Sequence, residues 1–259
     1  MTEDEALFAH ASDLKTQCAL NSVLQSTAFL DLRQRTLLLP LEKSEREYVK
    51  TFYYGGYEDA ERVCCVFVPS FFEEETPFDF FENHGDENPL SLLRLQKDRF
   101  TSLSHRDYLG ALMGLGLKRE MLGDIITDEN GCFLFCLSSV AGFVEKNLES
   151  AGRASVKASR VDLSELVLGE ERTKELFSSV SSLRLDSVLS CAFSLARSKA
   201  CAFIEGGSVF LNGVQTEKPD KKVTPGDKLV LRGKGKAVLA EVRGESKKGR
   251  THIIIKKYL

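Results

Sequence analysis

The last third of the chain, residues 183–259, carries the pattern that most restricts how the chain can fold. Apolar residues at helical spacing predict two short helices. The first opens at Arg184, and the second is expected to be capped by Ser198 and ended by Gly206-Gly207. A strand is predicted over 209–212, before a turn at a glycine. This order of elements, with cations at the joints, predicts a small α+β domain.

Charge is divided unevenly along the chain. The formal net charge is −3, but residues 183–259 contain 16 Lys and Arg against 7 Asp and Glu, a net +9. Residues 1–182 contain the other 19 basic and 31 acidic residues and carry −12. A basic terminal segment of this kind favours a polyanionic partner such as RNA, and a well-solvated basic face is the alternative.

Residues 1–60 are predicted to form a mostly helical N-terminal domain. Apolar residues recur near helical spacing in its first half, and Leu37–Pro40 is expected to end or bend the helix because proline lacks an N–H group. Ser44 and Glu47 fit a capping box for another helix, which is expected to run to Tyr54 and to end at Gly55-Gly56.

Residues 61–180 are predicted to form the middle domain, which opens with a strand near 63–68 and an acidic, Phe-rich loop over 71–89. Strands and helices then follow in the order βαββαβ, over 92–95, 105–113, 124–127, 132–137, 139–147 and 155–161. This is the ferredoxin-like plan of RNA-recognition-motif (RRM) domains, although the sequence signature of that motif is absent. Phe133 and Phe135 either stack on bases, or fill the core or lie under another domain.

Residues 162–182 are predicted to be a polar helical connector that ends in a serine-rich linker, so the C-terminal domain is expected to cover 181–259. The predicted fold class is therefore α+β. It combines a helical N-terminal region, a ferredoxin-like, RRM-like middle domain and a C-terminal α+β domain.

The C-terminal domain has several features that suit a phosphate backbone. Arg197 and Lys199 flank the start of its second helix, where free N–H groups and a partial positive charge attract anions. In the later strand over 229–232, alternation puts Arg232 on a polar face, and Lys234 and Lys236 follow on a glycine-rich loop. Phosphate contacts of this kind would dominate the affinity and make it sensitive to salt.

Residues 183–245 resemble an S4-type RNA-binding domain. The resemblance rests on Arg184-Leu185-Asp186, Arg197-Ser198-Lys199-Ala200, Asn212-Gly213, Lys218-Pro219 and Gly226-Asp227. It implies an RNA-binding surface built by the two helices and the following strand, in which Asp186 orients Arg184 or Arg197 rather than contacting RNA. The predicted RNA-binding residues are Arg184, Arg197, Ser198, Lys199, Asn212, Lys218, Arg232, Lys234 and Lys236.

Two further stretches resemble the YlmH family of bacterial RNA-binding proteins, which carry an S4 domain at the C-terminus. They are Gly55-Gly56-Tyr57 with Ala60-Glu61-Arg62, and His105 to Arg119 with Gly123-Asp124-Ile125. The resemblance covers nearly the whole chain. It implies binding to large ribosomal subunits that carry stalled peptidyl-tRNA, with rRNA as the main partner and tRNA as a second contact. It also implies a role in translation or ribosome rescue, and a link to cell division, because family members are encoded beside division genes.

Patterns that would indicate catalysis are incomplete. His105-Arg106-Asp107 resembles a kinase catalytic loop, but Leu112 stands where that loop needs an Asn. Arg106, Lys118 and Arg119 are instead expected to be surface cations that either make a secondary RNA contact or pair with local acids. No catalytic residue, metal or cofactor is predicted. The alternatives are an RNA-modifying enzyme targeted by the S4-type domain, and an acidic N-terminal half that docks proteins such as division proteins.

The cysteines and the hydropathy exclude other classes of protein. The seven cysteines are scattered without a CxxC pair and are expected to be buried free thiols rather than metal ligands. No apolar run approaches the roughly 18 residues of a membrane-spanning helix. The acidic N-terminus does not resemble a secretory signal, so a cytoplasmic protein without membrane insertion is expected.

Overall fold

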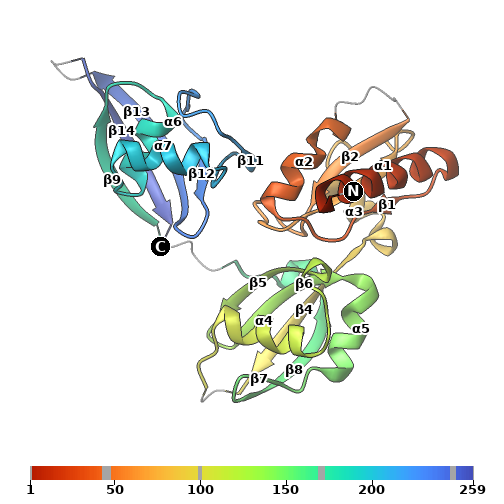
Figure 1. The fold of residues 1–259 in the computed structure, drawn as a ribbon. Coiled ribbons are helices and arrows are strands. Elements are labelled where there is room, and N and C mark those ends of the chain that lie inside the picture. The colour runs from red at the N-terminus through yellow and green to blue at the C-terminus, as the bar shows by residue number, and fades with distance from the viewer. Residues whose placement is uncertain (1, 43–47, 99–100, 169–172, 246–248, 259) are drawn as a thin grey trace. The chain divides into compact units, whose positions relative to one another are not determined.

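The computed structural model describes residues 2–42, 48–98, 101–168, 173–245 and 249–258. The chain divides into two units, residues 1–169 and residues 170–259, whose elements are labelled in Figure 1. Both units combine helices with antiparallel sheets, which confirms the predicted α+β class. Among the described residues, no single helix is both long and apolar enough to cross a membrane.

The first unit opens with an N-terminal lobe, residues 2–42 and 48–87. Its three-stranded antiparallel sheet has the order β1 (Gln25–Ser26), β3 (Cys64–Pro69), β2 (Val49–Tyr54). Strand β3 is central and buried along its whole length. One of its faces packs against α1 (Glu3–Asn21) and α2 (Leu32–Glu42) through Cys65 and Phe67. The other face, which carries Cys64, Val66 and Val68, joins a second core with the rest of the unit.

Several predictions for this lobe are wrong. The region expected to be mostly helical also contains a sheet: residues 49–54, predicted as helix, form β2, and the strand near 63–68, assigned to the middle domain, pairs with it. Their β-branched and aromatic residues suit a strand, and pairing with β3 decides the outcome. Pro40, expected to end or bend the helix, lies in the last turn of α2, two residues before its last described residue. The capping residues Ser44 and Glu47 lie outside the described residues.

The middle lobe, residues 88–98 and 101–168, contains the predicted βαββαβ order. Its sheet runs β5 (Leu122–Asp128), β6 (Gly131–Leu137), β4 (Leu90–Lys97), β8 (Ala154–Val161), followed by the short β7 (Ser150–Ala151). All pairs are antiparallel, which gives the four main strands the ferredoxin-like arrangement.

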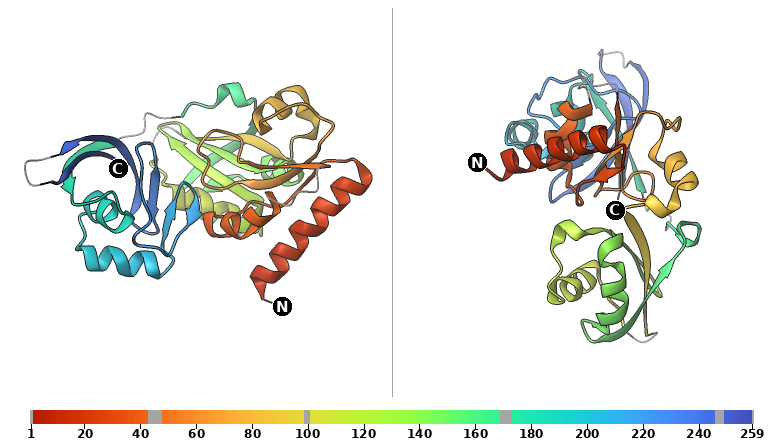
Figure 2. Two further views of the ribbon diagram at one scale, coloured as in Figure 1. Left: turned by 90° about the horizontal axis from the view of Figure 1, so that it is seen from above. Right: turned by 90° about the vertical axis from the view of Figure 1, so that its right-hand side faces the viewer.

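Helices α4 (His105–Gly114) and α5 (Ser138–Asn147) cover one face of the middle sheet (Figures 1 and 2). Ser104 and Asp107 form the capping box that starts α4. The acidic loop expected over 71–89 contains helix α3 (Pro77–Asn83) and the 3₁₀ turn η1 (Gly85–Glu87). Two further 3₁₀ turns of the same length, η2 (Arg119–Met121) and η3 (Leu163–Glu165), precede β5 and follow β8.

The second unit is one six-stranded antiparallel sheet with two helices on one side (Figure 2). The sheet order is β11 (Val214–Gln215), β10 (Val209–Leu211), β12 (Lys228–Leu231), β13 (Gly235–Glu245), β14 (Thr251–Tyr258), β9 (Thr173–Val180). Helices α6 (Leu185–Ala192) and α7 (Arg197–Glu205) pack on it through Val188, Leu189 and Ile204.

The predicted connector over 162–182 is wrong for its second half. Residues 173–180 form β9, which pairs with β14 along its full length and places Leu176 and Val180 against the core of the second unit. The second unit therefore begins before the expected boundary at 181. The strand register is set by β14, a partner about 80 residues away in the sequence, so local polarity alone did not show it.

Candidate nucleic-acid interface

A buried carboxylate holds two arginines at the start of α6. The side chain of Asp186 is 3% exposed, whereas those of Arg184 and Arg197 are 42% and 51% exposed. Arg184 donates from Nε to Oδ1 (3.3 Å) and from Nη2 to Oδ2 (3.2 Å). Arg197 donates to Oδ2 from Nε (3.1 Å) and from Nη2 (2.9 Å). Asp186 thus orients both arginines, which confirms and extends the predicted role.

The charge of this cluster is positive at neutral pH. Burial opposes ionisation of Asp186, but hydrogen bonds from Arg184 and Arg197 outweigh burial and hold the pKa of the carboxyl below its usual range. Two cations therefore stand against one anion. Because only the cations are exposed to any extent, the surface presents two oriented guanidinium groups to an incoming anion.

Helix α7 begins at this cluster without a side-chain cap. Its N-cap residue is Ala196, and its first turn contains no acidic residue. Ser198, predicted as the cap, is instead the second helical residue, because the extended backbone that precedes the helix belongs to Ala196. Arg197, Ser198 and Lys199 are all exposed in this first turn. The N–H groups and positive end of the helix therefore act together with two cationic side chains, which suits a phosphate group.

The segment before β12 brings further lysines to the start of α6. Its backbone pairs with the beginning of the helix: the N–H of Leu185 donates to the carbonyl of Lys221 (2.8 Å) and that of Asp186 to Pro219 (3.0 Å). Lys218, Lys221 and Lys222 are exposed on this segment. Only Lys218 was predicted as a contact. The run from Lys218 to Lys222 in the sequence was a signal for the other two.

The remaining predicted contacts lie on the sheet. Arg232 and Lys234 are exposed in the β12–β13 turn, and the Arg232 guanidinium lies 5.5 Å from the Phe210 ring centre. Lys236 is within β13, its Nζ 4.3 Å from the Tyr258 ring centre. Asn212 has a structural role: its amide donates to Asp227 (2.8 Å) and accepts from the N–H of Lys228 (2.8 Å). RNA contacts by these residues stay predictions.

The aromatic face of the middle sheet is covered by the N-terminal lobe. Phe135 is 1% exposed and Phe133 is 6% exposed. Tyr57 stacks on Phe135 with ring centres 5.4 Å apart, and the Arg94 guanidinium lies 4.5 Å from the centre of Phe133. Of the alternatives for this pair of phenylalanines, the structure confirms burial, so this face is closed to base stacking.

The two sequence stretches that resemble the YlmH family meet at one point in the first unit. The Asp124 carboxylate accepts from the Tyr57 hydroxyl (2.9 Å) and from the N–H groups of Glu61 (2.7 Å) and Arg62 (3.2 Å). The Arg62 guanidinium donates to the carbonyls of Phe29, Arg119 and Leu122. These contacts hold the two lobes of the unit together.

The secondary cations have different surroundings. Arg106 is exposed in the first turn of α4. Lys118 lies 3.8 Å from Glu120, so it pairs with a local acid. Arg119 donates to the carbonyl of Leu122 (2.6 Å) and is structural in part; burial and the nearby Arg62 lower its pKa to about 10. Arg106 is therefore the best placed of the three for a partner.

Asp107, which stood at the place of a catalytic aspartate in the kinase-like motif, caps α4. Asp107 accepts from the N–H and the hydroxyl of Ser104 (both 2.7 Å), and these bonds lower the pKa of its carboxyl. Among the described residues, no group of three His, Cys, Asp or Glu side chains could hold a metal ion. The cysteines are free thiols, as predicted; Cys18, Cys64, Cys65, Cys132 and Cys136 are buried, and Cys191 and Cys201 are half-buried.

Comparisons with known proteins agree with this organisation. Residues 86–165, which span the middle lobe, match a family model described as "Putative RNA-binding domain in YlmH". "Ribosome-associated protein quality control protein P2" of Bacillus subtilis is 33% identical over 232 residues, which cover 89% of this chain and 86% of that protein.

A solved structure shows the fold at lower sequence identity. "Cell division protein ylmH" from Streptococcus pneumoniae matches with a TM-score of 0.51 at 19% identity, over 64% of this chain and 94% of that chain. Because the Bacillus subtilis protein aligns with nearly the whole sequence and the middle lobe matches the family model, the chain belongs to the YlmH family.

Proposed function

We propose that this protein is a non-catalytic RNA-binding protein that recognises structured RNA of the large ribosomal subunit, with tRNA as a second contact. The observation that carries the proposal is the pair of arginines held by Asp186 beside the uncapped start of α7. The Bacillus subtilis relative is named as a ribosome-associated quality control protein, which supports a role in translation or ribosome rescue in the cytoplasm.

The mechanism is electrostatic and depends on fixed geometry. Arg184, Arg197 and Lys199 contact successive phosphates, and the free N–H groups of α7 complete one anion site. Lysines of the adjoining segment extend the positive surface. RNA bases do not stack on the middle sheet, so this face does not read the RNA sequence, because Phe133 and Phe135 are buried. Recognition therefore depends on the shape of a folded RNA and the spacing of its phosphates.

A link to cell division is a separate part of the proposal and rests on the name of the Streptococcus pneumoniae relative. In this view the ribosome is the primary partner, and a division protein would bind the acidic first unit. A variant of the first unit that causes a cell-division defect but still binds ribosomes would separate the two roles.

Ribosome binding tests the main proposal. The double variant R197A/K199A removes two cations from the start of α7, and K174A/K256A removes two exposed cations from β9 and β14 as a matched control. Binding to purified large subunits is measured by cosedimentation across a range of salt. The slope of log K against log salt should fall in magnitude by about 1.4 to 1.8 for R197A/K199A, since each phosphate contact contributes roughly 0.7 to 0.9.

The control variant should keep the wild-type slope. Unchanged binding by R197A/K199A at moderate salt would reject the proposal, and equal losses in the two variants would show that only net charge matters. Conversion of RNA by the purified protein to a chemically modified product, detected by mass spectrometry, would favour the alternative of an RNA-modifying enzyme.

A further inference from the structure

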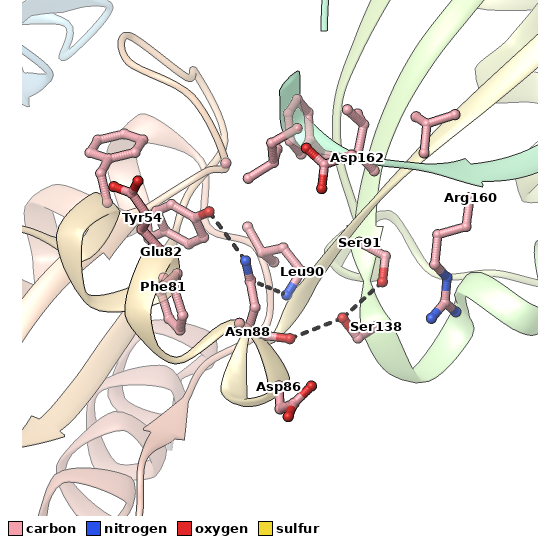
Figure 3. Close-up of a pocket in the computed structure, with 17 residues that line it drawn as sticks. Tyr54, Phe81, Glu82, Asp86, Asn88, Leu90, Ser91, Ser138, Arg160 and Asp162 are labelled. Atoms are coloured by element: carbon pink, nitrogen blue, oxygen red, sulfur yellow. Dashed lines mark hydrogen bonds between the residues drawn. The ribbon is translucent and has the colours of Figure 1, made fainter. Parts of the chain in front are cut away.

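A groove of about 780 Å³ lies within the first unit, between α3 and η1 on one side and the end of β8 with η3 on the other (Figure 3). Tyr54, Phe81 and Phe135 give it an aromatic floor. Two large apolar side chains at its edges are unusually exposed, Phe78 at 42% and Leu163 at 40%. The groove therefore offers apolar surface that the described residues of the first unit leave uncovered.

The polar groups inside the groove bond to one another. Asn88 donates from Nδ2 to the Tyr54 hydroxyl (3.3 Å), and its Oδ1 accepts from the N–H of Leu90 (2.9 Å). The Ser138 hydroxyl donates to the carbonyl of Asn88 (3.1 Å), and it lies 2.9 Å from the Ser91 hydroxyl. Figure 3 shows these contacts as one continuous chain. They fix the shape of the groove, so a ligand would be selected by its apolar side chains and its charge.

The charge around the groove is negative. Residues 70–90 contain seven Asp and Glu and no Lys or Arg. Glu82 and Asp86 line the groove and are exposed, and neither carboxylate has a hydrogen-bond or ion-pair partner in the part of the chain that the structure describes. Asp162 also lines it, while the guanidinium of Arg160 lies 3.9 Å from Glu145. Such a rim repels RNA phosphates and attracts cations.

We propose that this groove docks a basic peptide segment of a partner protein. An aromatic or aliphatic side chain of the peptide packs on the floor between Phe78 and Leu163, and Lys or Arg side chains pair with Glu82 and Asp86. An apolar centre with a charged rim is the usual arrangement of a peptide site. The inference does not depend on RNA binding by the second unit, because it concerns a surface that disfavours RNA.

Synthetic peptides test the proposal with the full-length protein. The probe is a fluorescein-labelled 12-residue peptide that alternates Lys with Leu and Phe, and binding is followed by anisotropy. Two matched peptides replace every Lys by Glu, or every Leu and Phe by Ser. The probe should bind at least about ten times more tightly than either, because both the apolar and the cationic side chains contribute.

Groove variants locate the site. E82Q/D86N should weaken binding of the probe about tenfold, which corresponds to about 1.4 kcal/mol for two exposed ion pairs. F78A should weaken it by a similar factor. The control E129Q/E149Q removes the same charge from exposed positions that do not line the groove and should bind as the wild type does. All four positions with altered charge are exposed, and thermal unfolding checks that each variant folds.

Several results would overturn the proposal. Equal losses in E82Q/D86N and E129Q/E149Q would mean that the probe binds the acidic surface without a site. Displacement of the probe by single-stranded RNA, together with weaker RNA binding by F78A, would make the groove an RNA site. Concentration-dependent self-association that E82Q/D86N abolishes, measured by sedimentation equilibrium, would make the occupant a second copy of this chain.

Discussion

Replacement of Asp186 by Asn is the sharpest test of how the RNA-binding surface is built. The substitution keeps the size of the side chain and removes the charge that holds Arg184 and Arg197. It removes no cation. The positioning role of Asp186 and the phosphate-binding role of the arginines therefore make different predictions for this variant.

The expected loss of stability follows from the exposure of the partners. The carboxylate is 3% exposed and accepts four N–H bonds, but the arginines are 42% and 51% exposed, so water can satisfy them when the carboxylate is gone. The free energy of unfolding of the second unit should fall by about 2 kcal/mol, the scale of hydrogen bonds to a charged group. Hydrogen exchange of the α6 and α7 amides measures it, and E205Q on α7 is the matched control.

The pH dependence has a defined sign. Because the pKa of Asp186 is lowered in the folded state, its stabilisation is complete above the unfolded value of about 3.9 and is lost as pH falls through the folded pKa. The difference in stability between the wild type and D186N should therefore be constant from about pH 5 to pH 8 and shrink below about pH 4.

The RNA affinity of D186N depends on two opposing effects, the net charge of the surface and the order of the two arginines. Loss of a negative charge increases long-range attraction, whereas two released arginines must be ordered again on binding, at about 0.5 to 1.5 kcal/mol each. We expect about tenfold weaker binding to large subunits with an unchanged salt slope, since the number of cations is the same. Affinity equal to or above that of the wild type would refute the positioning role.

Three further predictions concern the first unit and the thiols. G56A should destabilise the first unit by about 3 kcal/mol in thermal unfolding, because Gly56 has φ +92° and an added Cβ would lie 2.1 Å from the ring of Phe135; a melting temperature like that of the wild type would contradict this packing. Y57F should cost about 1 kcal/mol through the lost bond to Asp124, whereas the exposed control Y48F should cost nothing measurable. Five thiols are buried, and burial raises the pKa of each, so at most two of the seven should react with a disulfide reagent at pH 8 before unfolding, and faster labelling would show that the cores open; the five are Cys18, Cys64, Cys65, Cys132 and Cys136.

Local signals in the sequence were enough for much of the middle lobe. The helix predicted over 105–113 is α4, which the structure starts with a capping box of Ser104 and Asp107, and the hairpin near Asn130 joins β5 to β6. Each signal involves residues a few positions apart, so it does not depend on how the rest of the chain folds. The order of these elements then restricts the sheet to a few topologies, of which the ferredoxin-like one is observed.

Predictions failed where the partner was distant. Residues 49–54, predicted as helix, pair with β3, and residues 173–180, predicted as a connector, pair with β14. The boundary expected at 181 lies earlier for the same reason, since the second unit begins at residue 170. The cap of α7 shifted from Ser198 to Ala196 because the backbone conformation at the helix start, and not the residue type, defines the N-cap.

The sequence by itself determined the division of charge, the cationic positions and the resemblance of two distant stretches to one family. Only the tertiary structure decided how these are used. It buries Asp186 between two arginines, closes the aromatic sheet face with Tyr57, and joins the stretches at Gly55 and His105 through Asp124. These contacts join residues up to about 80 positions apart, so they depend on strand pairing and packing that no local pattern encodes.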